Sequence, residues 1–160
     1  DGLERREMTD AEFMAWKHAL MALDRYEDAD DVKVFIAMVR AVRDRLDARV
    51  IDVLLSTFTD QDDYGVQQAV EFVLDSADPA LFADRLAAGF PDLQRREGAM
   101  EWSLLLPGRI INSRDQVRIW ALVDAADRQE GSLGRYLRSE GFLDEYPELR
   151  PYLDSYPEHR

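Results

Sequence analysis

The sequence contains no cysteine among its 160 residues. This absence excludes a disulfide framework, a thiolate zinc site and a cysteine nucleophile, and it suits a reducing cytosol. No run of about eighteen apolar residues occurs, so no segment is predicted to span a membrane. The first residues are charged where a signal peptide would be apolar. We therefore expect a cytoplasmic protein.

Basic residues are scarce relative to acidic ones, with 20 Lys and Arg against 33 Asp and Glu and a formal net charge of −13. Nucleic acids and anionic membranes are bound through clustered Lys and Arg, so neither is an expected partner. A basic protein is the expected partner, although an acidic surface also serves solubility. Disorder is not expected, because 46% of the residues are hydrophobic and recur with a regular period.

Motifs that signal catalysis are absent from the sequence, which has no Gly-rich phosphate loop, no His-Glu-x-x-His and no nucleophile elbow. The two histidines, His18 and His159, are predicted to be surface residues rather than catalytic bases. Carboxylates are so frequent that any one pair is uninformative. We expect no enzymatic activity, no cofactor and no metal.

One acidic segment has the spacing of a calcium-binding loop, with Asp60, Asp62, Gly65 and Glu71 at its first, third, sixth and twelfth positions. Tyr64 occupies the fifth position, where a calcium loop needs an oxygen ligand. The other interpretation is that the two aspartates cap a helix and the glycine is merely tolerated near its first turn. We favour the helix cap.

Hydrophobic residues recur at steps of three and four along almost the whole chain, which predicts helices. Two starts carry strong capping signals: Thr9 with Glu12, and Asp78 before a proline. Ser113 has the same capping-box spacing and is predicted to open a later helix. Residues 50–55 are rich in β-branched side chains, but the lack of a partner strand favours a helix there too.

The predicted helix starts recur about every seventeen residues, as in stacked helical hairpins. We predict an all-α fold of antiparallel helical hairpins, either a short HEAT-like α-solenoid or a compact bundle. A single domain is expected over 1–160, with a helical-repeat core over 31–130 and a short helix plus an acidic, aromatic tail over 131–160. Gly89 is predicted to end one helix and Pro107-Gly108 to kink or break another.

Four residues stand out because packing of apolar helices does not require them: Glu71, Trp102, Arg109 and Asn112. Glu71 and Arg109 each lie among apolar neighbours, where a charge is costly to bury without a partner. Two interpretations stay open: the two side chains pair in the core, or each is solvated on a polar stripe. Trp102 is predicted to be a core residue, and Asn112 to end a helix.

With these residues, the segment from Ile51 to Asp115 resembles the Immunity protein 30 family, the all-α antidotes encoded beside polymorphic and contact-dependent toxins of bacteria. The resemblance implies a stoichiometric binder that occludes a cognate toxin and has no turnover of its own. The chain departs from the family pattern by carrying Gln67-Gln68 where an aromatic usually follows the glycine. The shared features are Phe58-x-Asp60, Gly65 before an apolar helix with Glu71, the Trp102 helix, and Arg109 to Ser113.

A basic toxin would be contacted by carboxylates gathered on one face of the protein, because opposite charges steer association and cover a cationic active site. Two other interpretations stay open: a generic helical-repeat adaptor for an unrelated protein, and a metal-dependent enzyme or calcium module. The carboxylates expected to bind the partner are Asp60, Asp62, Asp63, Asp144, Glu145 and Glu148.

Overall fold

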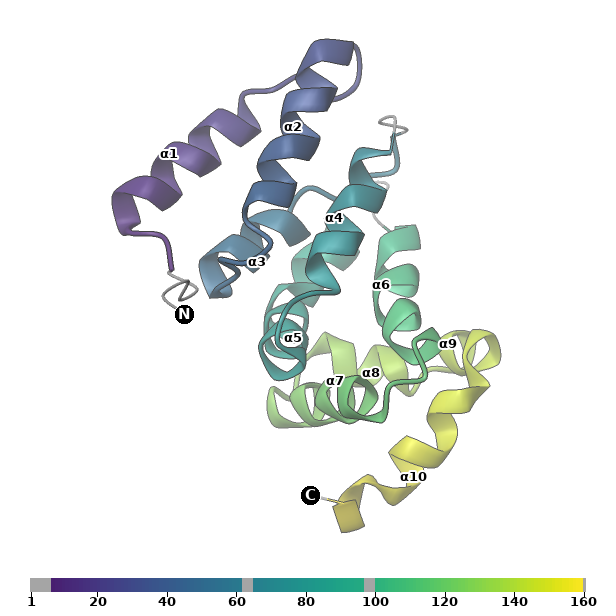
Figure 1. Ribbon diagram of the computed structural model, residues 1–160. Coiled ribbons are helices and arrows are strands. Elements are labelled where there is room, and N and C mark those ends of the chain that lie inside the picture. The colour runs from purple at the N-terminus through teal and green to yellow at the C-terminus, as the bar shows by residue number, and fades with distance from the viewer. Residues whose placement is uncertain (1–6, 62–64, 97–99, 160) are drawn as a thin grey trace. The chain divides into compact units, whose positions relative to one another are not determined.

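The computed structural model describes residues 7–61, 65–96 and 100–159, and all regular structure in these residues is helical (Figure 1). The predicted all-α class is therefore confirmed. None of the described helices is long and apolar enough to cross a bilayer. The helices fall into two compact units, Asp1–Ala77 and Asp78–Arg160. The single domain over 1–160 and the choice between solenoid and bundle stay predictions.

The first unit consists of α1 (Asp10–Met21), α2 (Ala29–Ala41), α3 (Ala48–Leu55) and α4 (Val66–Leu74). Helix α2 packs most extensively on α4 and also contacts α1, and α3 contacts α4. Packing between alternate helices is what stacking of successive hairpins produces. The side chains that are fully buried in this unit are Leu20, Val39, Val50, Ile51, Leu54, Phe58, Val66 and Val70.

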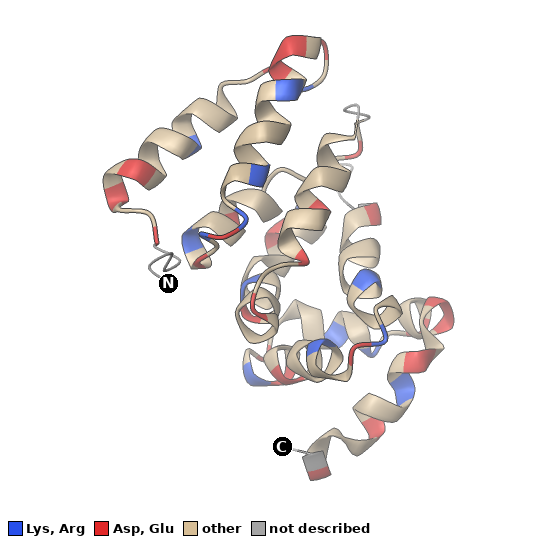
Figure 2. Cartoon of the chain, viewed as in Figure 1, with Lys and Arg blue, Asp and Glu red and all other residues tan. Residues whose placement is uncertain are grey.

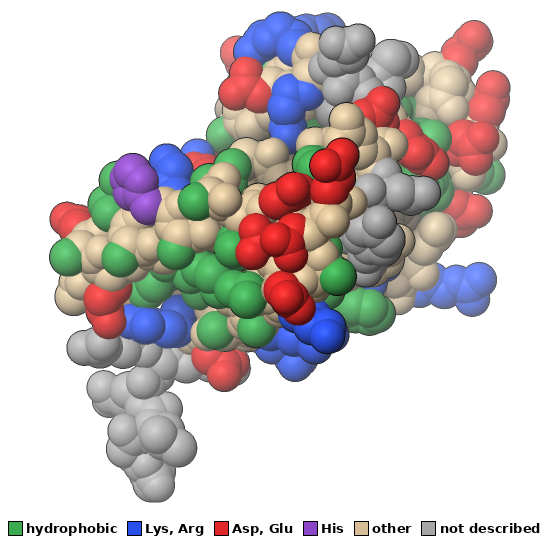
Figure 3. Space-filling view, turned by 90° about the horizontal axis from the view of Figure 1, so that it is seen from above, with side chains coloured by type: hydrophobic (Ala, Val, Ile, Leu, Met, Phe, Trp, Pro, Cys, Tyr) green, Lys and Arg blue, Asp and Glu red, His purple; other side chains and the backbone are tan. Residues whose placement is uncertain are grey.

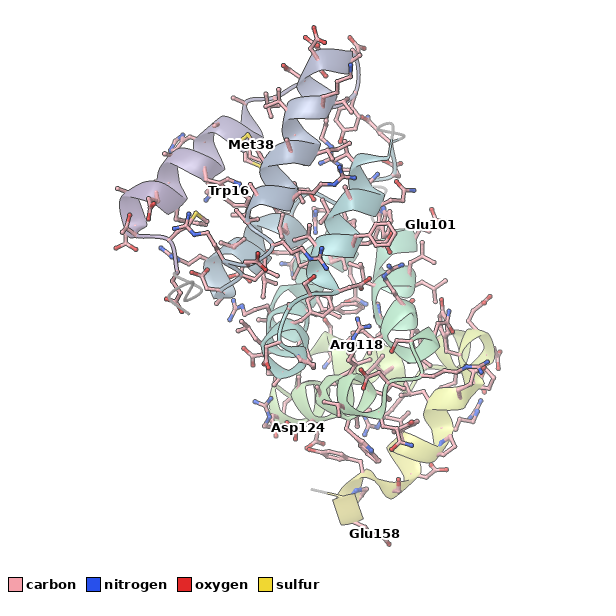
Figure 4. All side chains as sticks on the ribbon, in the orientation of Figure 1. Trp16, Met38, Glu101, Arg118, Asp124 and Glu158 are labelled. Atoms are coloured by element: carbon pink, nitrogen blue, oxygen red, sulfur yellow. The ribbon has the colours of Figure 1, made fainter. Side chains whose placement is uncertain are left out.

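Helix α1 is fixed at its start and in its middle by side-chain hydrogen bonds. The predicted capping box is confirmed, because Thr9 Oγ1 accepts from the Glu12 N–H at 3.1 Å and Glu12 Oε1 accepts from the Thr9 N–H at 2.9 Å. The Trp16 indole N–H donates to the Met38 carbonyl oxygen at 3.1 Å (Figure 4). Met38 belongs to the last turn of α2, where carbonyl groups lack a partner within the helix. The Trp16 side chain therefore both packs within this unit and caps the C-terminal end of α2.

Arg49 joins the start of α3 to the start of α1. Its guanidinium donates to Asp47 Oδ2 at 2.7 Å, to the Met8 carbonyl oxygen at 2.7 Å and to Asp10 Oδ1 at 2.9 Å. The same group lies over the Phe13 ring, 4.8 Å from its centroid. Asp47 is also the N-cap of α3 and accepts from the Val50 N–H at 3.0 Å. Polar and apolar contacts thus converge on one arginine.

This arrangement makes stability depend on pH through Asp47. Burial raises the pKa of Asp47, but hydrogen bonds from Arg49 and the Val50 N–H outweigh burial and hold that pKa below its ordinary value. The resulting stabilisation is present above the unfolded-state pKa and is lost as pH falls through the folded-state pKa. We expect Asp47→Asn, which keeps a capping oxygen, to cost about 1 kcal/mol near neutral pH.

Urea unfolding at about pH 7 and about pH 3 checks this prediction, since the second value lies below the ordinary carboxyl range. The difference in free energy of unfolding between wild type and Asp47→Asn should shrink at the lower pH. An equal difference at both pH values would show that the cap geometry, rather than the charge, stabilises this helix start.

The connection from α3 to α4 depends on Gly65 and Gln67. Gly65 has φ +88°, a left-handed conformation that side chains disfavour, so the expectation that it is merely tolerated is wrong. Gly65 itself is the N-cap of α4 without a side-chain cap, so Asp60 does not cap this helix, and Asp62 lies outside the described residues. Gln67 is buried and accepts from the Thr59 N–H at 2.6 Å. Its amide donates to the Gln61 carbonyl oxygen at 3.1 Å.

The second unit begins with α5 (Pro79–Arg95), α6 (Met100–Asn112) and α7 (Gln116–Arg128). It continues with α8 (Ser132–Leu137), α9 (Glu140–Glu145), the 3₁₀ helix η1 (Pro147–Leu149) and α10 (Arg150–His159). Helix α5 packs most extensively on α7 and also contacts α6 and α8, while α10 packs on α7. The region expected to be one short helix and a tail is therefore a series of short helical segments.

Helix α5 runs without interruption through Gly89 and Pro91, so the predicted end at Gly89 is wrong. A proline inside a helix costs roughly 3 kcal/mol. Leu86, Phe90 and Leu93 continue the apolar stripe across it and are buried, and burial of each such side chain contributes roughly 1.5–3 kcal/mol. The free energy gained by burying these side chains therefore outweighs the cost of the proline inside the helix.

Helix α6 likewise continues through Pro107 to Asn112, so the Pro107-Gly108 pair does not break it, and the predicted end at Asn112 is confirmed. The next cap differs from the prediction, because Asp115 rather than Ser113 caps α7. The Asp115 carboxylate accepts from the Val117 N–H at 3.0 Å, whereas the Ser113 hydroxyl donates to the Ile110 carbonyl oxygen. The capping box predicted at Ser113 is therefore wrong, and the helix begins after a simple aspartate cap two residues later.

Candidate protein-binding surface

Three of the carboxylates predicted to bind a partner lie close together in sequence at the end of α9 and in η1. Asp144, Glu145 and Glu148 are all exposed. Exposed Glu140, in the first turn of α9, adds a fourth carboxylate that sequence reasoning missed. None of the four has a hydrogen-bond or ion-pair partner among the described residues. We call these four residues the α9–η1 acids; Figure 2 shows them in red.

The backbone that carries the α9–η1 acids is held by local hydrogen bonds. The Ser139 hydroxyl donates to the Tyr136 carbonyl oxygen at 2.6 Å and accepts from the Phe142 N–H at 3.4 Å as the N-cap of α9. The Tyr146 N–H then donates to the Phe142 carbonyl oxygen at 2.9 Å, and the Leu149 N–H donates to the Tyr146 carbonyl oxygen at 3.1 Å. These bonds fix the turn from α9 into η1.

An aromatic row lies beneath this turn. The Phe142 ring centroid is 5.3 Å from that of Tyr136 and 5.0 Å from that of Tyr146. Tyr136 in turn contacts Phe90 of α5 at 5.3 Å. Phe142 and Leu149 are almost fully buried. Tilted aromatic pairs at these separations stabilise beyond the area they bury, so these contacts help to hold α9 and η1 in place despite their short length.

The negative charge of the α9–η1 acids acts on the tyrosine beside them. Burial raises the pKa of Tyr146, and the carboxylates of Glu145 and Glu148 raise it further. A phenol is harder to ionise in a negative field, so this pKa reports the local potential. Arg138 and Arg150 are exposed at the borders of the acidic segment. Arg138 donates weakly to the Gly134 carbonyl oxygen at 3.5 Å rather than to a carboxylate.

The other predicted partner-binding residues belong to the first unit. Asp60 is exposed on the connection after α3. Asp62 and Asp63 lie outside the described residues. That Asp60 shares a face with the α9–η1 acids stays a prediction.

The four residues singled out as a constellation are distributed over two helices in different units. Glu71 is half-buried on α4, while Trp102 and Arg109 are half-buried and Asn112 is exposed on α6. Trp102 is therefore less enclosed than predicted for a core residue. Because α4 and α6 belong to different units, both interpretations of Glu71 and Arg109, a pair in the core or two solvated side chains, stay open.

A second acidic group occupies the turn between α1 and α2, where Asp28 is the N-cap of α2. Figure 3, in which this turn faces the viewer, shows a cluster of acidic side chains. Several of them order the turn: Asp28 accepts from the Asp30 N–H at 2.9 Å, and Asp31 accepts from the Asp24 N–H at 2.8 Å. Five acids within one short segment was the signal that could have identified it. The group comprises Asp24, Glu27, Asp28, Asp30 and Asp31.

Concave and metal-binding features are sparse in the part of the chain that the structure describes. Within it, no group of three His, Cys, Asp or Glu side chains converges to hold a metal ion. An open pocket of 280 Å³ beside α7 and α8 is lined by charges of both signs, including Asp127, Glu130, Arg135 and Arg138. Mixed charge of this kind selects no single ligand class.

Comparison of the chain with protein-family models, with curated proteins and with solved structures finds no match.

Proposed function

We propose that this protein is an immunity protein that binds a basic bacterial toxin stoichiometrically and neutralises it by occlusion through the α9–η1 acids. The observation that carries the proposal is a set of exposed carboxylates, unpartnered among the described residues, on a turn fixed by an aromatic row. The chain's net charge of −13 supports an electrostatically steered encounter with a cation-rich surface.

Preformed carboxylates suit tight binding for two physical reasons. They give up no internal ion pair when a partner approaches, so the gain from new charge-assisted hydrogen bonds is not offset by broken ones. The buried rings beneath α9 and η1 hold the backbone in place, which lowers the ordering entropy lost on association. A toxin surface rich in arginine is the best match, because a guanidinium can bind a carboxylate through two parallel hydrogen bonds.

The proposal includes a cytoplasmic, non-enzymatic role without a cofactor. Its support is the absence of catalytic motifs from the sequence and the scarcity of cationic clusters suited to nucleic acid or anionic lipid. A second candidate, a helical-repeat adaptor for an unrelated protein, is favoured by the packing of α2 on α4. The neighbouring gene distinguishes the two candidates, since a toxin domain is expected there only for an immunity protein.

Reversing the α9–η1 charges should weaken toxin binding strongly. For Asp144→Lys/Glu145→Lys/Glu148→Lys, we expect at least about a hundredfold loss of affinity, since a close charge pair in a protein interface couples by about 1.5 kcal/mol or more. The salt dependence of binding should also fall. The measurement is calorimetric titration with the product of the adjacent open reading frame, alongside growth rescue on co-expression.

The matched control is Asp44→Lys/Asp154→Lys/Glu158→Lys, which makes the same change in net charge at exposed positions elsewhere. It should retain most of the affinity. A lowered pKa of Tyr146 in the test variant, read by ultraviolet titration, would show that the fold and local field responded as intended. Equal weakening by both variants would mean that only net charge matters, and failure of the wild type to rescue growth would contradict the immunity role itself.

A further inference from the structure

The outward face of α1 is unusual for so charged a chain. Its exposed side chains include Met14 and Met21, which are 45% and 54% exposed. At about 100° per residue, these methionines and the alanines of α1 form a continuous outer arc on which His18 is the one polar side chain. A third of all residues are charged, yet this arc carries no Asp, Glu, Lys or Arg. The alanines are Ala11, Ala15, Ala19 and Ala22.

The opposite side of α1 accounts for its attachment to the first unit. Phe13 and Leu20 are buried, and the half-buried Trp16 donates its indole N–H to Met38 of α2. Within this unit α1 packs on α2 (Figure 4). The outer arc therefore contributes nothing to holding α1 in place, and its apolar composition is not explained by packing on α2.

The shape and chemistry of this arc suit another helix. Alanines spaced three and four residues apart leave a shallow seam that permits close approach of a second helix, and helices pack at interaxial distances of about 8–10 Å. Methionine is flexible and polarisable, so it adapts to varied apolar surfaces. A helix-in-groove partner presents apolar residues at the same three- and four-residue spacing.

The charge at one end of the arc specifies the partner further. The turn acids Asp24, Glu27, Asp28 and Asp30 are exposed directly after the C-terminal end of α1. Asp28 and Asp30 also lie at the N-terminal end of α2, whose positive dipole end offsets part of their charge, whereas Asp24 and Glu27 lie outside both helices. Hydrophobic side chains lie next to the acidic cluster in Figure 3. A helix with an apolar face and lysine or arginine along its border complements both features.

A second copy of this chain is a poor occupant. In an antiparallel pairing of two α1 helices, the turn acids of one copy would approach Asp10 and Glu12 of the other. In a parallel pairing the two sets of turn acids would meet. Like charges directly opposed destabilise an interface, so both orientations are disfavoured.

We propose that the outer face of α1 and the turn acids form a docking site for a basic amphipathic helix of a partner protein. The site lies in the first unit and does not depend on the α9–η1 acids, so it goes beyond the immunity role and is tested separately from it. Burial of Met14 and Met21 supplies the apolar contribution. The turn acids orient the partner helix and speed its association through electrostatic attraction.

The test uses the full chain labelled with ¹³C at its methionine methyl groups and a synthetic helical peptide with leucines on one face and lysines on the other. On titration, the methyl signals of Met14 and Met21 should shift, whereas that of buried Met8 should not. Met14→Gln/Met21→Gln should weaken peptide binding at least about tenfold, which corresponds to about 1.4 kcal/mol. A peptide with glutamate in place of lysine should not bind.

Val117→Gln is the matched control, because Val117 is 68% exposed on α7 in the other unit, and this variant should bind the peptide as wild type does. Reversal of Asp144, Glu145 and Glu148 should also leave peptide binding unchanged, even if it abolishes toxin binding. Static Met14 and Met21 signals, or loss of peptide binding on reversal of the α9–η1 acids, would overturn the proposal. Signals that shift on concentrating the protein alone would assign the face to a second copy instead.

Discussion

Replacing Gly108 with alanine is expected to destabilise the protein by about 1–3 kcal/mol, because overpacking of a close contact typically costs that much. A Cβ atom at Gly108 would overlap with Cζ and Oη of Tyr146 and would lie 2.6 Å from its Cε2. Tyr146 cannot move away freely, since its ring packs on Phe142. The ring of Tyr146 therefore rests on α6 only because position 108 has no side chain.

The same substitution at Gly89 is the control for this prediction. Gly89 also lies inside a helix, but nothing comes within 4 Å of a Cβ atom built there. Alanine is the better helix former, so Gly89→Ala should stabilise by roughly 0.5–1 kcal/mol. Urea unfolding of both variants shows directly whether each substitution lowers or raises the free energy of unfolding.

A double substitution identifies the contact responsible. In a Tyr146→Ala background the clash is absent, so adding Gly108→Ala should be neutral or slightly stabilising. If Gly108→Ala costs the same with and without the Tyr146 ring, the destabilisation has another origin.

Local signals in the sequence were sufficient where a helix start depends on neighbouring residues alone. The capping box of Thr9 and Glu12 and the start at Asp78-Pro79 are both present as predicted. Ser113 shows the limit of such signals. Its hydroxyl donates to the last turn of α6, which leaves Asp115 to cap α7. A short polar side chain between two helices can serve either one, and spacing does not decide which.

Tertiary packing explains where the sequence-based predictions of the fold were wrong. The stop signals at Gly89 and Pro91 are outweighed by burial of Phe90 and Leu93, which a local rule does not weigh. From the sequence, Gln67 stands out only as a departure from the family pattern. Its buried amide bonds to the backbone at Thr59 and Gln61, and such a long-range partner is not encoded in any spacing.

The candidate binding surfaces could be predicted only as far as amino-acid composition reveals them. Acidic residues in a polar tail are visible in composition, so Asp144, Glu145 and Glu148 were identified, but their base of aromatic rings was not. The outer face of α1 was overlooked because the apolar period of Phe13, Trp16 and Leu20 already accounted for a helix. The alanines on the opposite side of α1 are explained by their high helix propensity. Only their exposure next to the turn acids indicates a binding surface.

Replacing Phe142 with alanine is expected to cost about 3–4 kcal/mol, since truncation of a buried phenylalanine removes its transfer energy and leaves a cavity. Phe142 is 1% exposed and contacts both Tyr136 and Tyr146. The effect should extend beyond stability, because the backbone of α9 and η1 would lose the ring on which it rests. If the proposed function holds, the α9–η1 acids should lose their fixed geometry and affinity for the proposed toxin should fall with it.

Phe142→Leu separates these two effects, because it keeps most of the buried volume while removing the ring contacts, and it should cost about 1–1.5 kcal/mol. Both variants are compared by urea unfolding and by calorimetric titration with the proposed toxin, the product of the adjacent open reading frame, at a temperature where each is folded. If rigidity of the turn sets affinity, toxin binding should weaken in the order wild type, Phe142→Leu, Phe142→Ala. Wild-type affinity in a folded Phe142→Ala variant would mean that the carboxylates bind as mobile charges, and that the aromatic row serves stability alone.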